Sequence, residues 1–262
     1  MGSQPQYSQG PIRVAFDGFL FDMDGTIIDS TPAVIKHWHN VGREIGVPGD
    51  TILETSHGRR SIDILKILAP EKANWECRFA SAGALKPGQL THHALTYCKI
   101  DVRQMEGRLP VEYSDDCVEI PGARSLLDGL IAISAPWAIV TSGTDPLVNG
   151  WLRVLSLATP EHLVSAESVE IGKPDPTCYL MGREKLALQD PSKELLVLED
   201  SPAGIKAGKA AGCKVLGLVT SHTAEEVAAA GPDWVVKDLD SVKIVGQEGG
   251  RVTLEFTNAL KY

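Results

Sequence analysis

Two aspartates placed two positions apart, directly after an apolar run, are the residues of this chain best suited to chemistry. The run Phe19-Leu20-Phe21 precedes Asp22, and Asp24 follows with only Met23 between the two aspartates. Both carboxylates can project from the carboxyl end of a buried strand, where one can attack phosphorus and the other can move the leaving group's proton. Asp-x-Asp-Gly also begins calcium loops of the form Asp-x-Asp-Gly-x5-Glu. Here Thr31 stands six positions past Gly25, so the calcium loop is excluded.

Other polar groups follow apolar runs later in the chain. The run 137–140 ends in hydroxyl and small residues able to hold a phosphate oxygen, the run 195–198 leads into two carboxylates, and one lysine sits in a rigid Gly-Lys-Pro turn. These candidates are Thr141, Ser142, Gly143, Lys173, Glu199 and Asp200. Ligands of an open parallel sheet collect at the carboxyl ends of its strands, so runs that end in this way indicate such a sheet.

The order of these features resembles that of the haloacid dehalogenase superfamily of phosphohydrolases. Its four motifs match at Asp22-Met23-Asp24-Gly25-Thr26, at Thr141, at Lys173 and at Glu199-Asp200, and the match covers nearly the whole chain after Pro11. Within the superfamily, residues 56–60, 138–144 and 199–212 are similar to the fungal glycerol phosphate and 2-deoxyglucose-6-phosphate phosphatases.

The resemblance implies an α/β fold, with a doubly wound parallel-sheet core of Rossmann type and an inserted helical cap domain. We expect a disordered tail at 1–11, a catalytic core at 12–30 and 118–262, and the cap at 31–117. In relatives, the residues equivalent to Trp75-Glu76 and to Gln104-Met105-Glu106-Gly107 almost adjoin in sequence, whereas this chain has an additional stretch, 77–101, between them. That stretch is either a loop peculiar to this chain or translated non-coding sequence of a mispredicted gene.

The resemblance also implies roles for the site residues. Asp22 is expected to form an aspartyl-phosphate that water then hydrolyses, and Asp24 to give and later take the proton. Lys173 is expected to bridge Asp22 and the phosphate. Thr141, Ser142 and Gly143 would bind the phosphate. Mg²⁺ would be held by Asp22, by the Asp24 backbone carbonyl and by Asp200, with Glu199 as a further candidate ligand, because hard oxygen ligands suit magnesium.

Each role has a structural alternative. A carboxylate pair can end a solvated strand, and Glu199 and Asp200 can cap the helix that Pro202 opens. Most lysines are solvated, so the role of Lys173 depends on the motif. Arg60 could reach the phosphate or the sugar from the cap, but Arg59 is as plausible, and one of the two is expected to face solvent.

The function that this reading favours is hydrolysis of small polyol or sugar phosphate monoesters of the glycerol phosphate and 2-deoxyglucose 6-phosphate type. The dehalogenases of the superfamily lack the second aspartate, so its presence favours a phosphate ester. A sugar phosphomutase of the same fold remains an alternative, and so does a catalytically idle regulatory or binding protein.

Composition agrees with a soluble globular protein. The chain has 262 residues, 43% of them hydrophobic, and a formal charge of -9, which argues against non-specific nucleic-acid binding. No apolar stretch approaches the roughly 20 residues that span a bilayer, and the amino-terminal residues do not read as a secretory signal. Five cysteines without metal-type pairing suggest free thiols in the cytoplasm. The oligomeric state cannot be read from the sequence, and a monomer is the expectation.

Periodicity predicts the elements that must position these groups. A helix is expected to begin at Ser30-Thr31-Pro32 and to end before Gly46, and a second to run from Ser61 to Pro70. Further strands are expected at 215–219 and 234–236, and an edge strand at 251–256.

Overall fold

The computed structural model of the protein describes residues 10–56, 58–70, 72–74 and 100–260. The predicted tail at 1–11 therefore falls outside the described residues except for Gly10 and Pro11. The same holds for the segment 77–101, of which only Ile100 and Asp101 are described.

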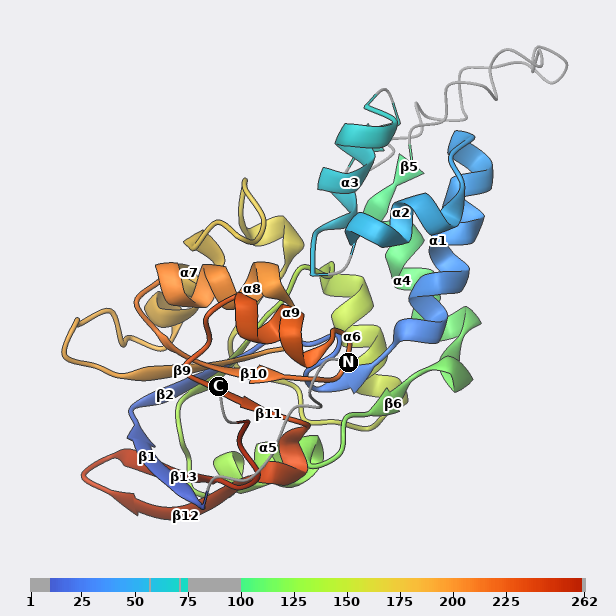
Figure 1. Ribbon diagram of the computed structural model, residues 1–262. Helices are drawn as coiled ribbons and strands as arrows, with labels where there is room; N and C mark the ends of the chain where they lie inside the picture. Colours follow the sequence, from blue (N-terminus) through green and yellow to red (C-terminus); the bar gives the residue numbers. More distant parts are fainter. Residues whose placement is uncertain (1–9, 57, 71, 75–99, 261–262) are drawn as a thin grey trace, which may run out of the picture.

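A parallel sheet of six strands forms the centre of the molecule (Figure 1). Its spatial order is β11-β10-β9-β2-β7-β8, and every neighbouring pair is parallel. The strands are β2 (Gly18–Phe21), β7 (Trp137–Val140), β8 (Leu163–Val164), β9 (Leu195–Glu199), β10 (Lys214–Leu218) and β11 (Trp234–Val236). The predicted parallel sheet and its buried strands are confirmed.

Helices cover both faces of this sheet, as the doubly wound prediction requires. They are α5 (Ala123–Ala132) and α6 (Asp145–Val154) on one face, and α7 (Thr177–Lys185), α8 (Pro202–Ala210) and α9 (Ala224–Ala229) on the other. Successive side chains of a strand point to opposite faces. Phe19 and Phe21 accordingly join the core beneath α5 and α6, whereas Leu20 joins the core beneath α7 to α9.

A group of helices is inserted after the first strand of the sheet. The chain leaves at β3 (Ile28–Asp29) and returns at β6 (Val118–Glu119), and these two short strands pair antiparallel. Between them lie α1 (Thr31–Ile45), α2 (Gly49–Ser56), α3 (Ser61–Leu68), β4 (Ala73–Asn74), β5 (Ile100–Asp101) and α4 (Val102–Glu112), followed by a 3-10 turn at Ser114–Asp116. The predicted helices correspond to α1 and α3, while α2 and α4 were not predicted.

The inserted helices have an apolar core of their own, built around Trp38, Ile52, Leu65 and Val102. Figure 1 shows them grouped at one end of the sheet, apart from the helices on its faces. None of the helices in the described ranges combines the length and the apolarity that crossing a bilayer would require.

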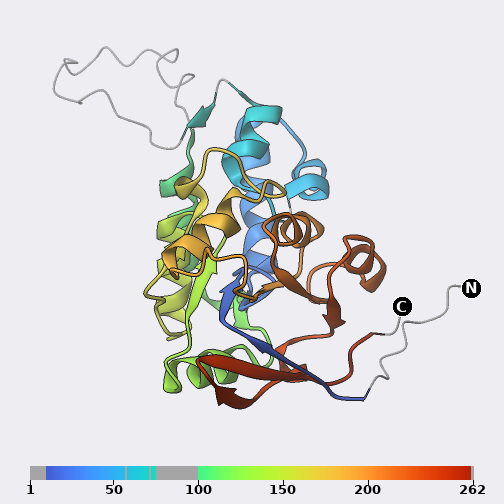
Figure 2. The same ribbon diagram turned by 90° about the vertical axis from the view of Figure 1, so that its left-hand side faces the viewer.

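The prediction of an edge strand at 251–256 is wrong. β13 (Arg251–Phe256) is the middle strand of a separate antiparallel sheet, between β1 (Ile12–Phe16) and β12 (Val242–Glu248). Figure 2 shows this sheet at the end of the molecule opposite α1 to α3. Its alternation of buried and half-buried residues is typical of a strand with one face on a core, but it does not reveal how many partners the strand has. Two further 3-10 turns lie in the core, at Ala166–Ser168 after β8 and at Leu239–Ser241 before β12.

Candidate active site

Three buried carboxylates meet where two neighbouring strands end. Asp22 follows β2, and Glu199 and Asp200 end and follow β9, which lies beside β2. The three side chains are 6%, 0% and 3% exposed, and one oxygen of each lies within 4.8 Å of the others. The parallel register brings together residues almost 180 positions apart, as the motif order predicts.

Lys173 is inserted into this cluster and is buried with it. Its Nζ donates to Asp22 Oδ1 at 2.5 Å, to Glu199 Oε1 at 2.6 Å and to the Val140 carbonyl at 3.2 Å. Burial alone would lower the pKa of Lys173, but the carboxylates of Asp22 and Glu199 raise it above the ordinary value, so the ammonium stays charged. An ammonium has three donors. All three are engaged, so the predicted contact with Asp22 is present, whereas a bond to a phosphate would require an exchange of partners.

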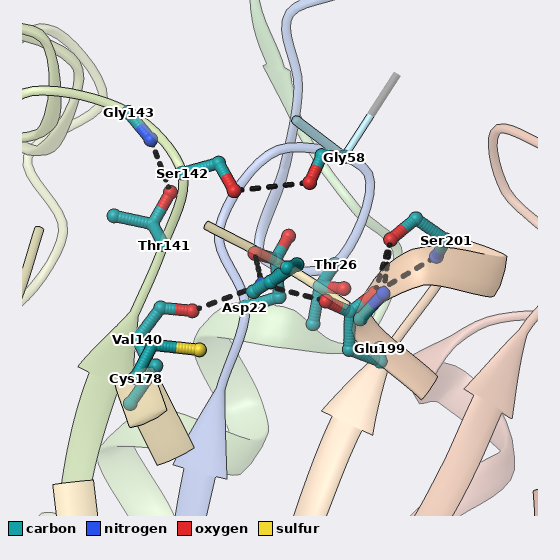
Figure 3. A network of polar contacts seen from close by, with 12 residues as sticks. Asp22, Thr26, Gly58, Val140, Thr141, Ser142, Gly143, Cys178, Glu199 and Ser201 are labelled. Atoms are coloured by element: carbon teal, nitrogen blue, oxygen red, sulfur yellow. Dashed lines mark hydrogen bonds and ion pairs between the residues drawn. The ribbon is translucent and has the colours of Figure 1, made fainter. Parts of the chain in front are cut away.

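Polar neighbours hold the other two carboxylates. Glu199 Oε1 also accepts from the Tyr179 hydroxyl at 3.1 Å, and its Oε2 accepts from the Ser201 backbone N–H at 2.8 Å and from the Ser201 hydroxyl at 3.0 Å. Asp200 accepts from Thr26 at 3.2 Å and from the hydroxyl of Ser221. Figure 3 shows Asp22, Glu199 and Ser201 within this network.

The cluster carries more negative charge than its one ammonium can balance. Burial raises the pKa of Asp22 well above its ordinary value, with the neighbouring Glu199 and Asp200 adding to the effect, and burial together with Glu199 raises the pKa of Asp200 to about 7. With every carboxyl ionised, two negative charges are in excess. A divalent cation would compensate for them, and the all-oxygen donor set fits a hard ion such as Mg²⁺.

Asp24 lies beside this cluster, and its carboxylate accepts a hydrogen bond from Ser30. The Ser30 hydroxyl donates to Asp24 Oδ1 at 2.5 Å and makes no capping bond to α1, although Ser30 occupies the N-cap position of that helix. The backbone N–H of Thr31 instead donates to the Asp29 carboxylate at 3.0 Å. Burial raises the pKa of Asp24, although the bond from Ser30 opposes the shift. A raised pKa suits a carboxyl group that must carry a proton to a leaving group.

The turn after Asp24 requires glycine. Gly25 has a φ of +84°, in the left-handed region that favours glycine, and a β-carbon there would lie 2.2 Å from Asp200 Oδ2. This close approach places the loop after β2 against the end of β9.

The loop after β7 supplies small polar groups to the same place. Thr141 is 4% exposed, and its Oγ1 accepts from the Gly143 N–H at 3.0 Å, which leaves the hydroxyl proton of Thr141 available to a ligand. Ser142 Oγ donates to the Gly58 carbonyl at 3.0 Å and so ties this loop to the inserted helices (Figure 3).

A cavity of about 110 Å³ lies between these loops and the inserted helices. From the core it is lined by residues that include Asp22, Asp24, Thr141, Ser142, Gly143 and Asp200, and from the inserted segment by residues that include His37, Ser56, Arg59 and Glu106. Three of the predicted site residues, Lys173, Glu199 and Arg60, are not among the residues that line this cavity.

Arg60 joins the two parts of the molecule. Its five N–H donors all find acceptors, namely both carboxylate oxygens of Asp63 and the backbone carbonyls of Ala166, Val169 and Glu170, at 2.5 to 3.1 Å. The side chain is 2% exposed. No donor of Arg60 is left for a phosphate. The structure therefore does not place Arg60 in the predicted role of binding the phosphate or the sugar. Arg59 is the exposed member of the pair and reaches the cavity.

Two buried residues of the lining were not predicted. Glu106 is 4% exposed, and its Oε2 accepts from the Thr144 N–H at the start of α6 at 2.8 Å. Burial raises the pKa of Glu106 to about 7. His37 is 6% exposed, and burial lowers its pKa to about 4, so it is neutral near pH 7. A signal for both was available, because His37 and Glu106 occupy positions of the apolar faces of their helices, where a polar side chain is unusual.

His37 should make the stability of the protein fall in acid. The unfolded chain binds a proton at His37 near pH 6.5, while the folded chain does not until about pH 4, so the unfolded state holds more protons between these values and stability rises with pH. Between pH 7 and pH 5, wild type should lose about 2 kcal/mol of unfolding free energy relative to His37→Gln. Urea unfolding at several pH values measures this difference.

His39→Gln, at a half-buried histidine of the same helix, controls for the changed helix propensity. Parallel pH curves for wild type and His37→Gln would show that His37 is not held neutral.

Comparisons with known proteins point to one family. The model of the haloacid dehalogenase-like hydrolases matches residues 16–212. The chain is 34% identical over 253 residues to glycerol-1-phosphate phosphohydrolase 2 of Saccharomyces cerevisiae, covering 94% of this chain and 92% of that protein. It is 31% identical to 2-deoxyglucose-6-phosphate phosphatase 2 of the same yeast, covering 95% of this chain and 98% of that protein.

Solved structures agree on the fold. A hydrolase from Pseudomonas syringae superposes with a TM-score of 0.63 at 24% identity, covering 85% of this chain and 94% of that one. The predicted resemblance to the superfamily, and to the two groups of fungal phosphatases within it, is confirmed by these matches.

Proposed function

This chain belongs to the haloacid dehalogenase-like hydrolase family, and we propose that it is a divalent-metal-dependent phosphatase of small polyol and sugar phosphate monoesters. The single observation that carries the proposal is the convergence of Asp22 and Asp200, from the ends of β2 and β9, with Lys173, from the segment before α7, into one buried cluster. This cluster borders the cavity that Asp24 and Thr141 also line.

Asp22 is the nucleophile in this proposal. Its carboxylate oxygen forms a bond to phosphorus while the ester P–O bond breaks, and Asp24 gives its proton to the departing alkoxide. A water molecule then attacks phosphorus and gives a proton to Asp24, the bond from phosphorus to Asp22 breaks, and inorganic phosphate is released. Lys173 fixes Asp22 through the bond to Oδ1, and its positive charge opposes the rise in the pKa of Asp22. The raised pKa of Asp24 allows it to carry the proton in the first step.

Asp22, Asp200 and the Asp24 backbone carbonyl would hold the metal, which we propose to be Mg²⁺. Glu199 is a third carboxylate of the same group, but its oxygens already accept from Lys173, Tyr179 and Ser201. When bound, the ion offsets the repulsion between the carboxylates and an approaching phosphate dianion.

The phosphate oxygens would be bound by the loop after β7. The Thr141 hydroxyl has a proton to donate, and Ser142 and Gly143 border the same cavity. We assign the substrate-facing guanidinium to Arg59 rather than to Arg60, because Arg59 borders the cavity and the donors of Arg60 are engaged elsewhere.

The inserted helices at 31–117 would act as a cap that excludes bulk water and selects the leaving group. Their bonds to the core through Ser142, Arg60 and Glu106 support this role. A cytoplasmic monomer remains part of the proposal, supported as to location by the free thiols of Cys117, Cys178 and Cys213.

A phosphate-release screen tests this proposal. With Mg²⁺, the protein should hydrolyse glycerol 1-phosphate and 2-deoxyglucose 6-phosphate, and a chelator should lower both rates by at least about 100-fold because metal catalysis is worth several kcal/mol. Readdition of Mg²⁺ should restore the rates. Mg²⁺ should also raise the melting temperature, since an ion that binds only the folded state stabilises it.

The other candidate functions give different results in the same screen. A phosphomutase would move the phosphate to another hydroxyl and release little of it. An idle binding protein would turn over no ester with or without Mg²⁺. Either outcome would remove the proposed hydrolysis.

A further inference from the structure

One wall of the cavity has polar groups that the chemistry at phosphorus does not use. The wall consists of His37 from α1, Ser56 from α2 and Glu106 from α4, and we call it the tail wall. It borders the same cavity as the core residues that would bind the phosphate. An ester held with its phosphorus at Asp22 would place its leaving group in the cavity that the tail wall lines.

Two atoms of the tail wall are buried without a partner. His37 and Ser56 are each 6% exposed, and among the described residues neither His37 Nε2 nor Ser56 Oγ has a hydrogen-bond partner. A buried polar atom left unpaired is destabilising, and a ligand that supplies its missing partner removes that cost. Hydroxyl groups both donate and accept, so a hydroxylated ligand can satisfy a neutral imidazole and a serine hydroxyl together.

Burial raises the pKa of Glu106 to about 7, so the tail wall carries a negative charge at pH values above this. Glu106 Oε2 accepts from the Thr144 N–H at 2.8 Å, and the Ser61 side chain also bonds to the carboxylate. Because a carboxylate has about four acceptor positions, Glu106 keeps further acceptor capacity. His37 is neutral and adds no positive charge. Arg59 also borders the cavity but is exposed, so solvent screens its charge more than that of the buried Glu106.

We propose that His37, Ser56 and Glu106 form a subsite for the hydroxyl groups of an uncharged polyol or sugar leaving group, and that Glu106 rejects leaving groups that carry a second negative charge. This inference rests on the proposed phosphatase activity and specifies its substrate class. The unpaired donors and acceptors supply attraction to hydroxyls. The carboxylate supplies repulsion of carboxylated or doubly phosphorylated esters, which the phosphate-binding side alone would not distinguish.

Three esters test the subsite at pH 8, where Glu106 is ionised. They are glycerol 1-phosphate with a hydroxylated tail, phosphoglycolate with a carboxylate tail, and p-nitrophenyl phosphate with neither. Wild type should prefer glycerol 1-phosphate over phosphoglycolate by at least about 100-fold in kcat/KM, because bringing two like charges together in a buried site is strongly unfavourable. Glu106→Gln keeps an acceptor for the Thr144 N–H. It should reduce this preference about tenfold or more, chiefly by raising kcat/KM for phosphoglycolate.

Ser56→Ala should lower kcat/KM for glycerol 1-phosphate about tenfold and leave p-nitrophenyl phosphate unchanged. Glu112→Gln, at an exposed glutamate of the same helix α4, is the matched control and should keep the wild-type preference. If the role of Glu106 were purely structural, Glu106→Gln would change kcat/KM for all three esters by the same factor.

Affinities measured without turnover make the test independent of catalysis. Calorimetry gives the affinities of glycerol 1-phosphate and phosphoglycolate for the protein carrying Asp22→Asn, with and without Glu106→Gln. A ratio of the two affinities that does not change with Glu106→Gln would overturn the subsite. Failure of wild type to hydrolyse any of the three esters would overturn the proposed phosphatase function instead, while the affinity ratio still decides the subsite.

Discussion

Asp22→Asn should hydrolyse glycerol 1-phosphate at least about 10⁴-fold more slowly than wild type, the scale of loss when an enzyme's nucleophile is removed. An amide cannot form the acyl phosphate, and its oxygen is a far weaker nucleophile than a carboxylate. The substitution keeps the shape of the side chain and an acceptor for Lys173, so the cluster should stay assembled. Initial rates of phosphate release measure the loss.

Acid quenching gives a second measure of the same step. Wild type mixed with radiolabelled substrate should retain acid-stable label on the protein during turnover, whereas Asp22→Asn should retain none. Equal labelling of both proteins would show that the acceptor is another residue.

Asp17→Asn is the matched control for Asp22→Asn. Asp17 is also a buried aspartate, 8% exposed and ion-paired with Lys193 at 3.0 Å, but it precedes β2 at the end of the strand opposite Asp22. It should retain wild-type turnover. Loss of activity in both variants would indicate a general effect of neutralising a buried carboxylate, and would remove the assignment of Asp22.

The second large loss of activity is expected when Asp24 is replaced, and the size of the loss should depend on the leaving group of the ester. Asp24→Asn should lower the rate of glycerol 1-phosphate hydrolysis by about 10² to 10⁴-fold, the usual contribution of general acid catalysis. An alkoxide is a poor leaving group without a proton, whereas p-nitrophenolate leaves readily. The rate on p-nitrophenyl phosphate should therefore fall by less than about tenfold, if the proton given to the leaving group is the main contribution of Asp24.

Steady-state rates on both esters measure this difference. Asparagine retains the oxygen that accepts from Ser30, so the side chain should remain in place. Equal losses on the two esters would indicate that Asp24 acts through the metal or the loop geometry, and not as the acid.

The sheet and the main site residues could be predicted because their signals are local and their order along the chain is informative. Apolar runs that end in Asp22, Thr141 and Glu199 each predict a strand with a polar residue at its carboxyl end. Parallel connections bring those ends to one edge of a sheet whatever the details of the helices. The burial of Lys173 between two carboxylates follows from the same convergence.

Predictions failed where several partners compete for one group. Ser30 has the residue type and position of a helix cap, yet its hydroxyl bonds to Asp24 because the carboxylate lies within reach in the fold. Residues 251–256 alternate as an edge strand would, but β1, more than 230 residues earlier in the chain, pairs with the side that an edge would leave open.

Residue types and their order along the chain were enough to determine the family, the parallel sheet and the paired aspartates, because strand formation and carboxylate chemistry depend on short stretches. Only the tertiary structure decided which of Arg59 and Arg60 reaches the cavity, and that His37 and Glu106 face it. Those outcomes depend on how the inserted helices are rotated and docked on the core. A step of one residue turns a helical side chain by about 100°, so long-range packing determines which neighbour faces the site.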